Sequence, residues 1–189
     1  MSQGKTRNQW VETGFELFAH EGHEGLQVER LARILNRNKS GFYHYFGTME
    51  NYIGALMRHL TKQADIVVTE TRKANEFDPG FLNVMVNQSI IILATMQLVR
   101  NRNVPLFTET FRQVTHKIDQ ALLPLWVTHI GITNNPDLAL RYFEIVRDMF
   151  FSRITSTMLN YEYLHNLARE ARTIVLELNQ DGAGTKNPE

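Results

Sequence analysis

The sequence predicts an all-α fold of about nine helices, and three observations support this prediction. Apolar residues recur at three- and four-residue spacing through most of the chain. Gly22, Asn36 and Gly131 stand where this spacing is interrupted, and such residues commonly end helices. An Asn-Asn-Pro segment at 134–136 marks a further turn. We expect an N-terminal three-helix domain followed by a larger helical domain.

The first helix is predicted over residues 6–21. Trp10, Val11, Phe15 and Phe18 form one apolar stripe along it. Gly14 interrupts the helix interior, where glycine costs about 1 kcal/mol relative to alanine. We interpret this glycine as a place where a neighbouring element packs closely.

Residues 28–47 carry the most informative pattern in the chain. Val28, Leu31, Ala32 and Leu35 share one face of a short helix. Asn36 is expected to end this helix in the left-handed conformation, and Asn38 to cap the next one through its side chain. The second helix, 39–46, has an apolar side with Phe42 and Phe46, and an opposite hydrogen-bonding side. Two short helices joined by a tight turn predict a helix-turn-helix, which can place its second helix in a DNA major groove.

The charge of this segment favours nucleic acid. Between Arg30 and Thr48 there are four basic residues and neither Asp nor Glu. Attraction to phosphate is the main sequence-independent contribution to DNA affinity. The alternative is a helical hairpin with a solvated basic face, which the pattern alone leaves open.

The remaining helices are predicted from periodicity and turn residues. A fourth helix, capped by Thr48, runs over 48–72, and the segment 74–80 is a loop. Helices are then expected over 81–99, 106–113, 115–129, 137–159 and 163–178. We expect domains at 1–50 (helix-turn-helix, motif 28–47), at 51–179 (effector binding and dimerisation), and a disordered tail at 180–189.

The helix predicted over 137–159 carries two apolar stripes rather than one. One stripe is Ala139, Phe143, Val146, Phe150 and Ile154, and the other is Leu138, Tyr142, Ile145 and Met149. A helix of this kind needs partners on two sides. In a lone subunit one surface would stay exposed, unless both stripes are filled within that subunit.

Composition excludes several classes of function. The formal net charge is zero, so DNA affinity must come from a local patch and from dimerisation. The chain has no cysteine, which removes disulfides and thiolate metal sites and suits a cytoplasmic location. No signal peptide or membrane-spanning run is visible. We find no phosphate-binding glycine loop, nucleophile elbow or HExxH motif, so we expect neither an enzyme, a cofactor nor a metal.

The motif resembles the N-terminal domain of the TetR-like (tetracycline-repressor-like) transcriptional regulators. The resemblance runs without a gap from Trp10 to Tyr52 and includes Phe15-Glu16-Leu17-Phe18, Gly22, and Tyr43-His44-Tyr45-Phe46 at the junction to the fourth helix. It implies a homodimeric regulator, most often a repressor, that binds a palindromic operator. It also implies that a small-molecule effector binds the C-terminal domain, and that the last two helices of each subunit pair as a four-helix bundle.

Site residues are assigned by chemistry and by this resemblance. Lys39 and Arg37 are fixed-charge donors for a phosphate or a guanine edge, and Ser40 and His44 can reach bases or phosphates. The resemblance implies a phosphate bond for Tyr43, whose alternative is a half-buried ring with its hydroxyl in water. The full expected set is Gln27, Arg37, Lys39, Ser40, Tyr43, His44 and Thr48.

Candidate effector contacts lie among polar and aromatic residues of the C-terminal helices. Pockets and cores share this composition, so ordinary core packing is the alternative for each of them. The candidates are Gln88, Thr95, Met96, Phe107, Phe111, His116, Trp126 and Phe150.

The chain departs from the family pattern at positions that meet phosphate. Gly41 replaces a recognition-helix threonine, and Met49 replaces a lysine at the junction. Gln27 and Arg37 are the residues placed to compensate. These departures keep a second function open: a helical ligand-binding or interaction protein of the same fold, with lost or altered specific DNA binding.

Overall fold

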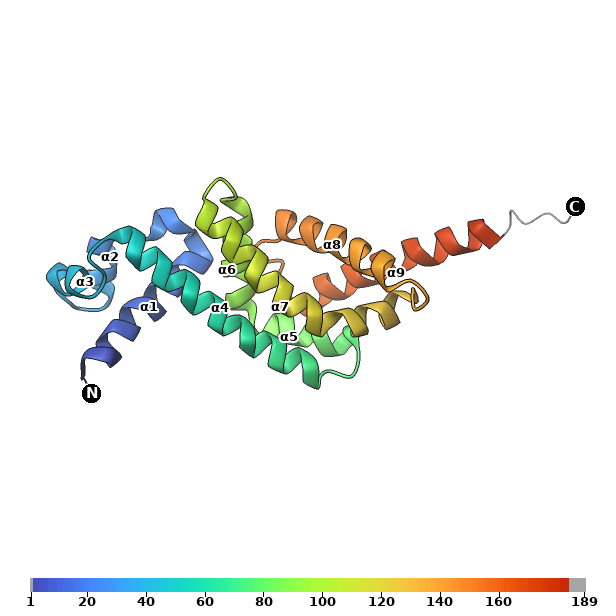
Figure 1. Ribbon diagram of the computed structural model, residues 1–189, viewed down its shortest axis with the longest axis horizontal. Helices are drawn as coiled ribbons and strands as arrows, with labels where there is room; N and C mark the ends of the chain where they lie inside the picture. Colours follow the sequence, from blue (N-terminus) through green and yellow to red (C-terminus); the bar gives the residue numbers. More distant parts are fainter. Residues whose placement is uncertain (1, 184–189) are drawn as a thin grey trace, which may run out of the picture. The chain divides into compact units, whose positions relative to one another are not determined.

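The computed structural model describes residues 2–183, and the side chains of residues 4–177. Over that range the chain forms nine α-helices and no strand, so the predicted all-α class is confirmed (Figure 1). A short 3-10 turn, His23–Gly25, follows the first helix, and a π-type turn, Phe77–Phe81, precedes the fifth. The helices are α1 Ser2–Glu21, α2 Val28–Ile34, α3 Lys39–Phe46, α4 Met49–Lys73, α5 Leu82–Asn87, α6 Ser89–Arg100, α7 Pro105–Ile130, α8 Pro136–Arg153 and α9 Tyr161–Ala183.

The helices divide into two compact units. The first unit contains the chain up to Ile66 together with Ser89–Lys117, and the second contains Val67–Gln88 together with the chain from Ile118. The helix-turn-helix therefore shares a unit with α6 and the first half of α7. The domain boundary predicted after residue 50 divides the chain by function, and it stays a prediction.

The core of the first unit forms around α1. Its predicted stripe is buried, and Phe18 is fully enclosed. Phe18 meets Phe107 edge-on, with ring centroids 5.6 Å apart. The buried Gln97 of α6 donates from Nε2 to the Ala19 carbonyl at 3.2 Å. These contacts join the end of α1 to α6 and α7.

Tyr52 of α4 packs against α1 at Gly14, where the missing side chain leaves room for the Tyr52 hydroxyl. A Cβ atom on Gly14 would lie 1.7 Å from the Tyr52 hydroxyl oxygen. That hydroxyl donates to the Trp10 carbonyl at 2.6 Å, out of contact with water. The Tyr52 ring also lies 4.9 Å from the ring of Phe42 and 4.8 Å from that of Phe46, both on α3. The close approach predicted at Gly14 is therefore present, and it fixes α1, α3 and α4 together.

The single helix predicted over 81–99 is wrong, because the segment breaks at Gln88. This residue has φ −105° and ψ 30°, and α5 and α6 lie on either side of it. Asn87 and Ser89 flank the break, and both side chains compete for backbone hydrogen bonds that a helix would use. The apolar pattern runs through the break, so periodicity could not reveal it.

The two helices predicted over 106–113 and 115–129 are one helix, α7. Val114 and Thr115, at the predicted break, are both buried. The Thr115 hydroxyl donates to the Phe111 carbonyl at 2.9 Å, one turn earlier. A β-branched residue that bonds back in this way is compatible with a continuous helix. Pro124 also lies inside α7.

The last two helices differ from their predicted bounds. The predicted end of α8 at residue 159 is too late, since Ile154 is extended at φ −60° and ψ 142°. A run of hydroxyl residues, 155–157, follows, and such residues favour turns over helix interiors. Helix α9 continues to Ala183, so the first residues of the predicted tail are helical. The rest of that tail, 184–189, lies outside the described residues.

The second unit is built around Trp126. Its ring is buried and lies 5.2 Å from Phe77 and 5.5 Å from Phe143, measured between ring centroids. Its indole N–H donates to the Ala139 carbonyl at 3.0 Å, which ties α7 to α8. Tyr142 then joins α8 to α9 by donating to the Ala171 carbonyl at 2.8 Å.

Within the described part of the chain, no single helix has both the length and the apolar character needed to cross a membrane. One bent pair, residues 77–87 and 89–100, meets that test only when its two helices are counted together.

Substituting Gly14→Ala is expected to lower the free energy of unfolding by about 3 kcal/mol. The added methyl group displaces Tyr52, which combines overpacking with the loss of a buried hydrogen bond, against a smaller gain in helix propensity. Urea denaturation measures the change. The matched control is Gly4→Ala on the same helix, where a Cβ atom meets nothing within 4 Å. Equal stability of the two variants would contradict the role given to Gly14.

Candidate nucleic-acid interface

A tight turn orients α3 against α2. Asn36 adopts φ 50°, which confirms its predicted role as the left-handed residue that ends α2. The Arg37 N–H then donates to the Ala32 carbonyl at 2.8 Å, and the Asn36 N–H to the Arg33 carbonyl at 3.2 Å. Bonds of this type satisfy carbonyls that the end of a helix leaves free.

The start of α3 differs from expectation in one detail. Asn38 occupies the N-cap position with the expected extended backbone, but its side chain makes no capping hydrogen bond. The predicted side-chain cap is therefore wrong. The Asn38 side chain is exposed, and water satisfies free N–H groups at exposed helix ends.

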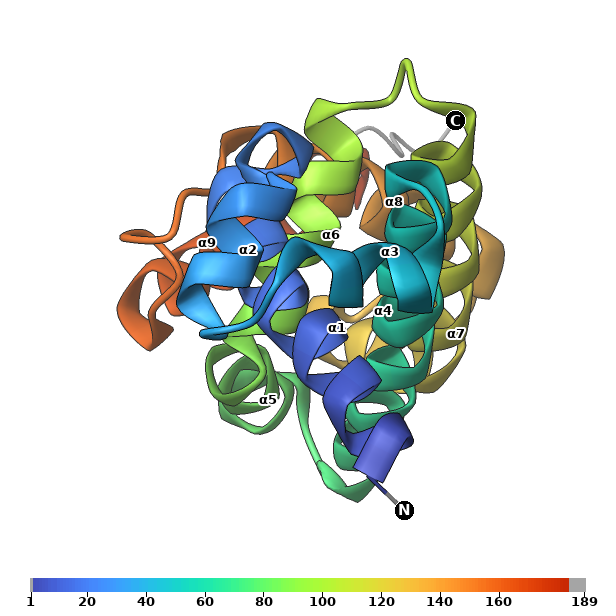
Figure 2. The same ribbon diagram turned by 90° about the vertical axis from the view of Figure 1, so that its left-hand side faces the viewer.

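Helix α3 has the two sides that the sequence predicts. Phe42 and Phe46 are buried, and Phe42 meets Trp10 edge-on at 5.7 Å between ring centroids. The opposite side is exposed, and 53% of the Tyr43 surface is accessible. Figure 2 looks onto α2 and α3 from this end of the chain. The exposed side chains of that face are Lys39, Ser40, Tyr43 and His44.

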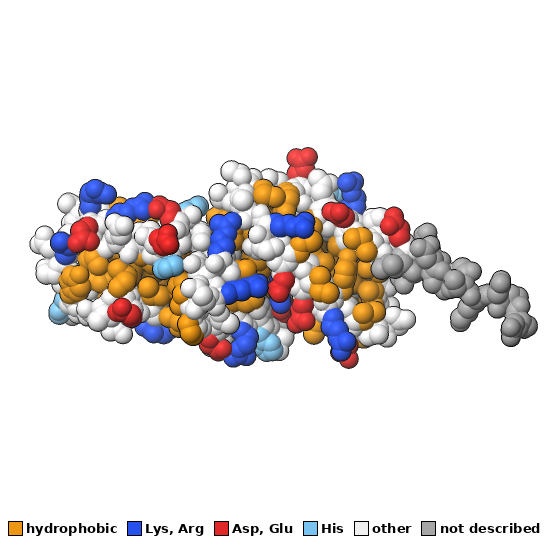
Figure 3. All heavy atoms as spheres, turned by 90° about the horizontal axis from the view of Figure 1, so that it is seen from above, with side chains coloured by type: hydrophobic (Ala, Val, Ile, Leu, Met, Phe, Trp, Pro, Cys, Tyr) orange, Lys and Arg blue, Asp and Glu red, His pale blue; other side chains and the backbone are white. Residues whose placement is uncertain are grey.

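Two acidic residues reduce the positive charge that the sequence window suggested. Arg30 forms a two-pronged ion pair with Glu21, and Lys39 is 3.0 Å from a Glu29 carboxylate oxygen. Glu29 directly precedes the acid-free window, and Glu21 lies nine residues before Arg30. The fold places both carboxylates beside basic residues of that window. Basic and acidic side chains are likewise interspersed over one face of the molecule (Figure 3).

The Lys39–Glu29 pair is charged on both sides at neutral pH. The hydrogen bond from Lys39 lowers the pKa of Glu29, and the same bond raises the pKa of Lys39. An exposed pair of this kind contributes little to stability. It does, however, place a negative charge beside the first residue of α3, where a phosphate would approach.

The other expected DNA contacts flank α3. Gln27 is exposed at the N-cap position of α2 and makes no capping bond. Arg37 is exposed, with one long contact of 3.5 Å to the Gln9 side chain. The Thr48 hydroxyl accepts a bond from the Asn51 N–H at 3.2 Å, which confirms that it caps α4. All seven expected residues lie on the helix-turn-helix or at its edges, and their contact with DNA stays a prediction.

The expected effector contacts do not share one unit. Thr95, Met96, Phe107, Phe111 and His116 belong to the first unit, and Gln88, Trp126 and Phe150 to the second.

Several of these side chains already have partners in the core. The Thr95 hydroxyl donates to the Ile91 carbonyl at 2.8 Å, and the Trp126 indole donates to Ala139. Phe107 packs on Phe18 and on the ring of His23, whereas His116 is exposed. Their part in a pocket stays a prediction. Among the described residues, no group of three or more His, Asp or Glu side chains is arranged to hold a metal ion.

One comparison with known proteins gave a match. Residues 11–56 match the family model of the bacterial regulatory proteins, tetR family. This range contains the helix-turn-helix and the junction to α4. Residues 11–56 therefore form an N-terminal domain of the tetR-family type. Comparisons with curated proteins and with solved structures gave no match.

The matched domain is that of DNA-binding transcriptional regulators, and α3 is the second helix of its helix-turn-helix. The sequence did not predict that Glu21 and Glu29 pair with basic residues of the candidate interface. A charge count over Glu29 to Lys39 would have included one of them, but only the fold brings Glu21 to Arg30. Packing does not explain Gly41, because a Cβ atom there would meet only the Trp10 ring, at 4.0 Å.

Substituting Glu29→Gln is expected to strengthen binding to duplex DNA about threefold to tenfold at low salt. The change removes one negative charge near phosphate and releases Lys39 for contact. Fluorescence anisotropy across a salt series measures the affinity. The control Glu16→Gln makes the same charge change on α1. Equal affinities for both variants would show that Glu29 does not restrain the interface.

Proposed function

We propose that this tetR-family regulator is a repressor that binds a palindromic operator as a homodimer and releases it when a small molecule binds the C-terminal domain. The observation that carries the proposal is the outward face of α3. Lys39, Ser40, Tyr43 and His44 are exposed on a helix whose other side is anchored by Phe42 and Phe46. A rigid helix with exposed donors is what reading a major groove requires.

Exposed apolar residues on α8 support the homodimer. Phe143 and Phe150 of the first predicted stripe are buried within the unit, whereas Leu138 and Ile145 of the second are 50% and 67% exposed. On α9, Ile174 is also 45% exposed. Water-exposed aliphatic residues on neighbouring turns favour a partner, and a second copy of the same surface satisfies two-fold symmetry.

The dimer gives the recognition helices their spacing. Two copies of α3 must lie about 34–36 Å apart to occupy successive major grooves of B-form DNA. An effector that changes this distance lowers operator affinity. The loss cannot exceed the difference between the effector's binding free energies for the two states of the protein.

The composition of the first unit supports coupling between an effector and α3. Helix α6 is held to α1 by the Gln97–Ala19 hydrogen bond, and α1 is held to α3 and α4 through Tyr52. Candidate contacts Thr95 and Met96 lie on α6. A shift of α6 on effector binding would pass to the recognition helix through these contacts. We further propose a cytoplasmic location, where operator DNA is found.

The second candidate function is a helical ligand-binding or interaction protein of this family with altered or lost operator specificity. Gly41 and Met49 favour it, because both replace phosphate-contacting types, and the pairing of Lys39 with Glu29 adds to that. Salt-dependent binding that requires a particular palindrome supports the regulator. Binding that ignores sequence supports the alternative.

The double substitution Lys39→Ala with Tyr43→Phe is expected to weaken binding to the operator at least about tenfold. It removes one charged and one neutral donor from the exposed face of α3 and leaves the buried face unchanged. A gel shift against DNA upstream of the protein's own gene measures it. Lys62→Ala, an exposed cation on α4, is the control. Unchanged affinity of the double variant would remove both residues from the interface.

Ile145→Arg is expected to convert the dimer to a monomer and weaken operator binding at least about tenfold. Dimerisation would bury the arginine charge in an apolar interface without a partner, and the free-energy cost of doing so opposes association. Sedimentation analysis gives the mass, and anisotropy gives the affinity. Leu106→Arg is the control, since Leu106 is an exposed leucine on α7. If Ile145→Arg stays dimeric with a native circular dichroism spectrum, the α8 surface is not the interface.

A further inference from the structure

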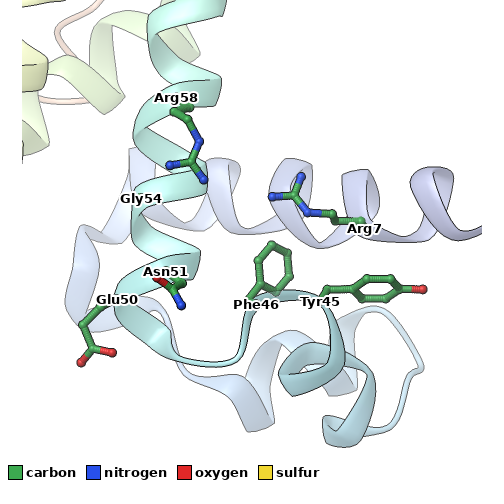
Figure 4. A pocket seen from close by; sticks show the side chains of 7 residues that line it. All are labelled: Arg7, Tyr45, Phe46, Glu50, Asn51, Gly54 and Arg58. Atoms are coloured by element: carbon green, nitrogen blue, oxygen red, sulfur yellow. The ribbon is translucent and has the colours of Figure 1, made fainter.

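An open cavity of about 300 Å³ lies in the first unit, beside the end of the recognition helix. Three helices line it: α1 contributes Arg7, α3 contributes Phe46, and α4 contributes Asn51, Gly54 and Arg58 (Figure 4). The family match and the proposed operator contacts give this cavity no role.

The cavity is positively charged. The Arg7 guanidinium lies over the Phe46 ring, 5.2 Å from its centroid, and Arg58 extends from the facing side of α4. Among the described residues, neither arginine has an acidic partner within ion-pair distance. Two guanidinium groups therefore face the same hollow without a counter-charge.

The one acidic residue on the rim does not neutralise them. Figure 4 shows the Glu50 carboxylate turned away from both arginines. Hydrogen bonds to its own backbone N–H and to Thr48 lower the pKa of Glu50. This carboxylate is thus used at the start of α4, where negative charge suits the helix dipole.

Gly54 leaves the floor of the cavity open. Glycine weakens a helix interior relative to alanine, and Gly54 is inside α4. Unlike Gly14, it is not required by a neighbouring helix, since a Cβ atom there would meet only the Arg58 guanidinium, at an ordinary 3.5 Å. The absent side chain instead gives space beneath that guanidinium.

We propose that this cavity binds a small phosphate-bearing anion. Guanidinium groups match the geometry of phosphate oxygens, and the Asn51 amide adds a neutral donor on the same side. The volume is at the lower end for small-ligand sites. A bound anion would bridge α1 and α4 next to Phe46, and so would stabilise the packing of α3 against these two helices.

The position of the cavity on α3 favours a free anion over the operator backbone. Successive residues of an α-helix are about 100° apart. Tyr45, which lines the cavity, therefore points away from the side that carries Lys39, Ser40 and Tyr43. The proposal does not depend on operator binding, so it is tested on the protein without DNA.

The test is isothermal titration of the full chain with inorganic pyrophosphate, at constant ionic strength set with chloride. We expect saturable binding that Arg7→Gln and Arg58→Gln each weaken at least about tenfold, because each removes a charge-assisted contact. Lys62→Gln removes an exposed cation from the same helix outside the cavity, and it should bind as the parent does. Binding that is absent, or that both arginine variants retain in full, overturns the proposal.

Gly54→Ala distinguishes an effect on anion binding from an effect on the stability of the fold. The substitution should raise the melting temperature, because alanine favours the helix, while it weakens pyrophosphate binding by filling the floor. Equal pyrophosphate affinity in this variant counts against the cavity. If pyrophosphate does not bind but the arginine variants lose affinity for duplex DNA, the cavity serves the DNA backbone and the free-anion proposal fails.

Discussion

The arrangement of the DNA-binding region depends on one buried contact, the hydrogen bond from the Tyr52 hydroxyl to the Trp10 carbonyl. It forms only because Gly14 has no side chain, and the Tyr52 ring then meets Phe42 and Phe46. Three helices are thereby fixed at one point. Burial also raises the pKa of Tyr52 well above its ordinary value, so the hydroxyl keeps the proton of this bond even in alkaline solution. The inner face of α3 is held against α1 and α4 in this way.

The outer face of the same helix is electrostatically balanced rather than strongly basic. Lys39 faces Glu29, and Arg30 faces Glu21, while the whole chain has no formal net charge. Long-range attraction of the chain to DNA is therefore weak, and affinity depends on local contacts, which the proposed dimer would make twice. The cationic cavity at Arg7 and Arg58 is different, since among the described residues neither arginine forms an ion pair and the Glu50 carboxylate is turned away from both.

Helix α8 shows how one element can serve two surfaces. Its buried stripe packs within the second unit, where Phe143 lies against Trp126, and its other stripe leaves Leu138 and Ile145 in water. Helix α6 has a different character: eight of its twelve residues, 91–98, are buried, and Gln97 joins it to α1. The proposed dimer uses the exposed stripe of α8, whereas the proposed coupling to α3 runs through α6.

The sequence by itself determined the helical class, the helix-turn-helix, and the inner and outer faces of α3, because these follow from local periodicity and turn residues such as Asn36. It also predicted the close approach at Gly14 and the second stripe of α8. It did not predict the break at Gln88, because the apolar pattern runs through that break. It did not predict the continuity of α7 either, where burial of Val114 and Thr115 outweighs weak local preferences. Only the tertiary structure brought Glu21 to Arg30, and Arg7 and Arg58 to one cavity. Contacts between residues distant in the chain leave no periodic signal in the sequence.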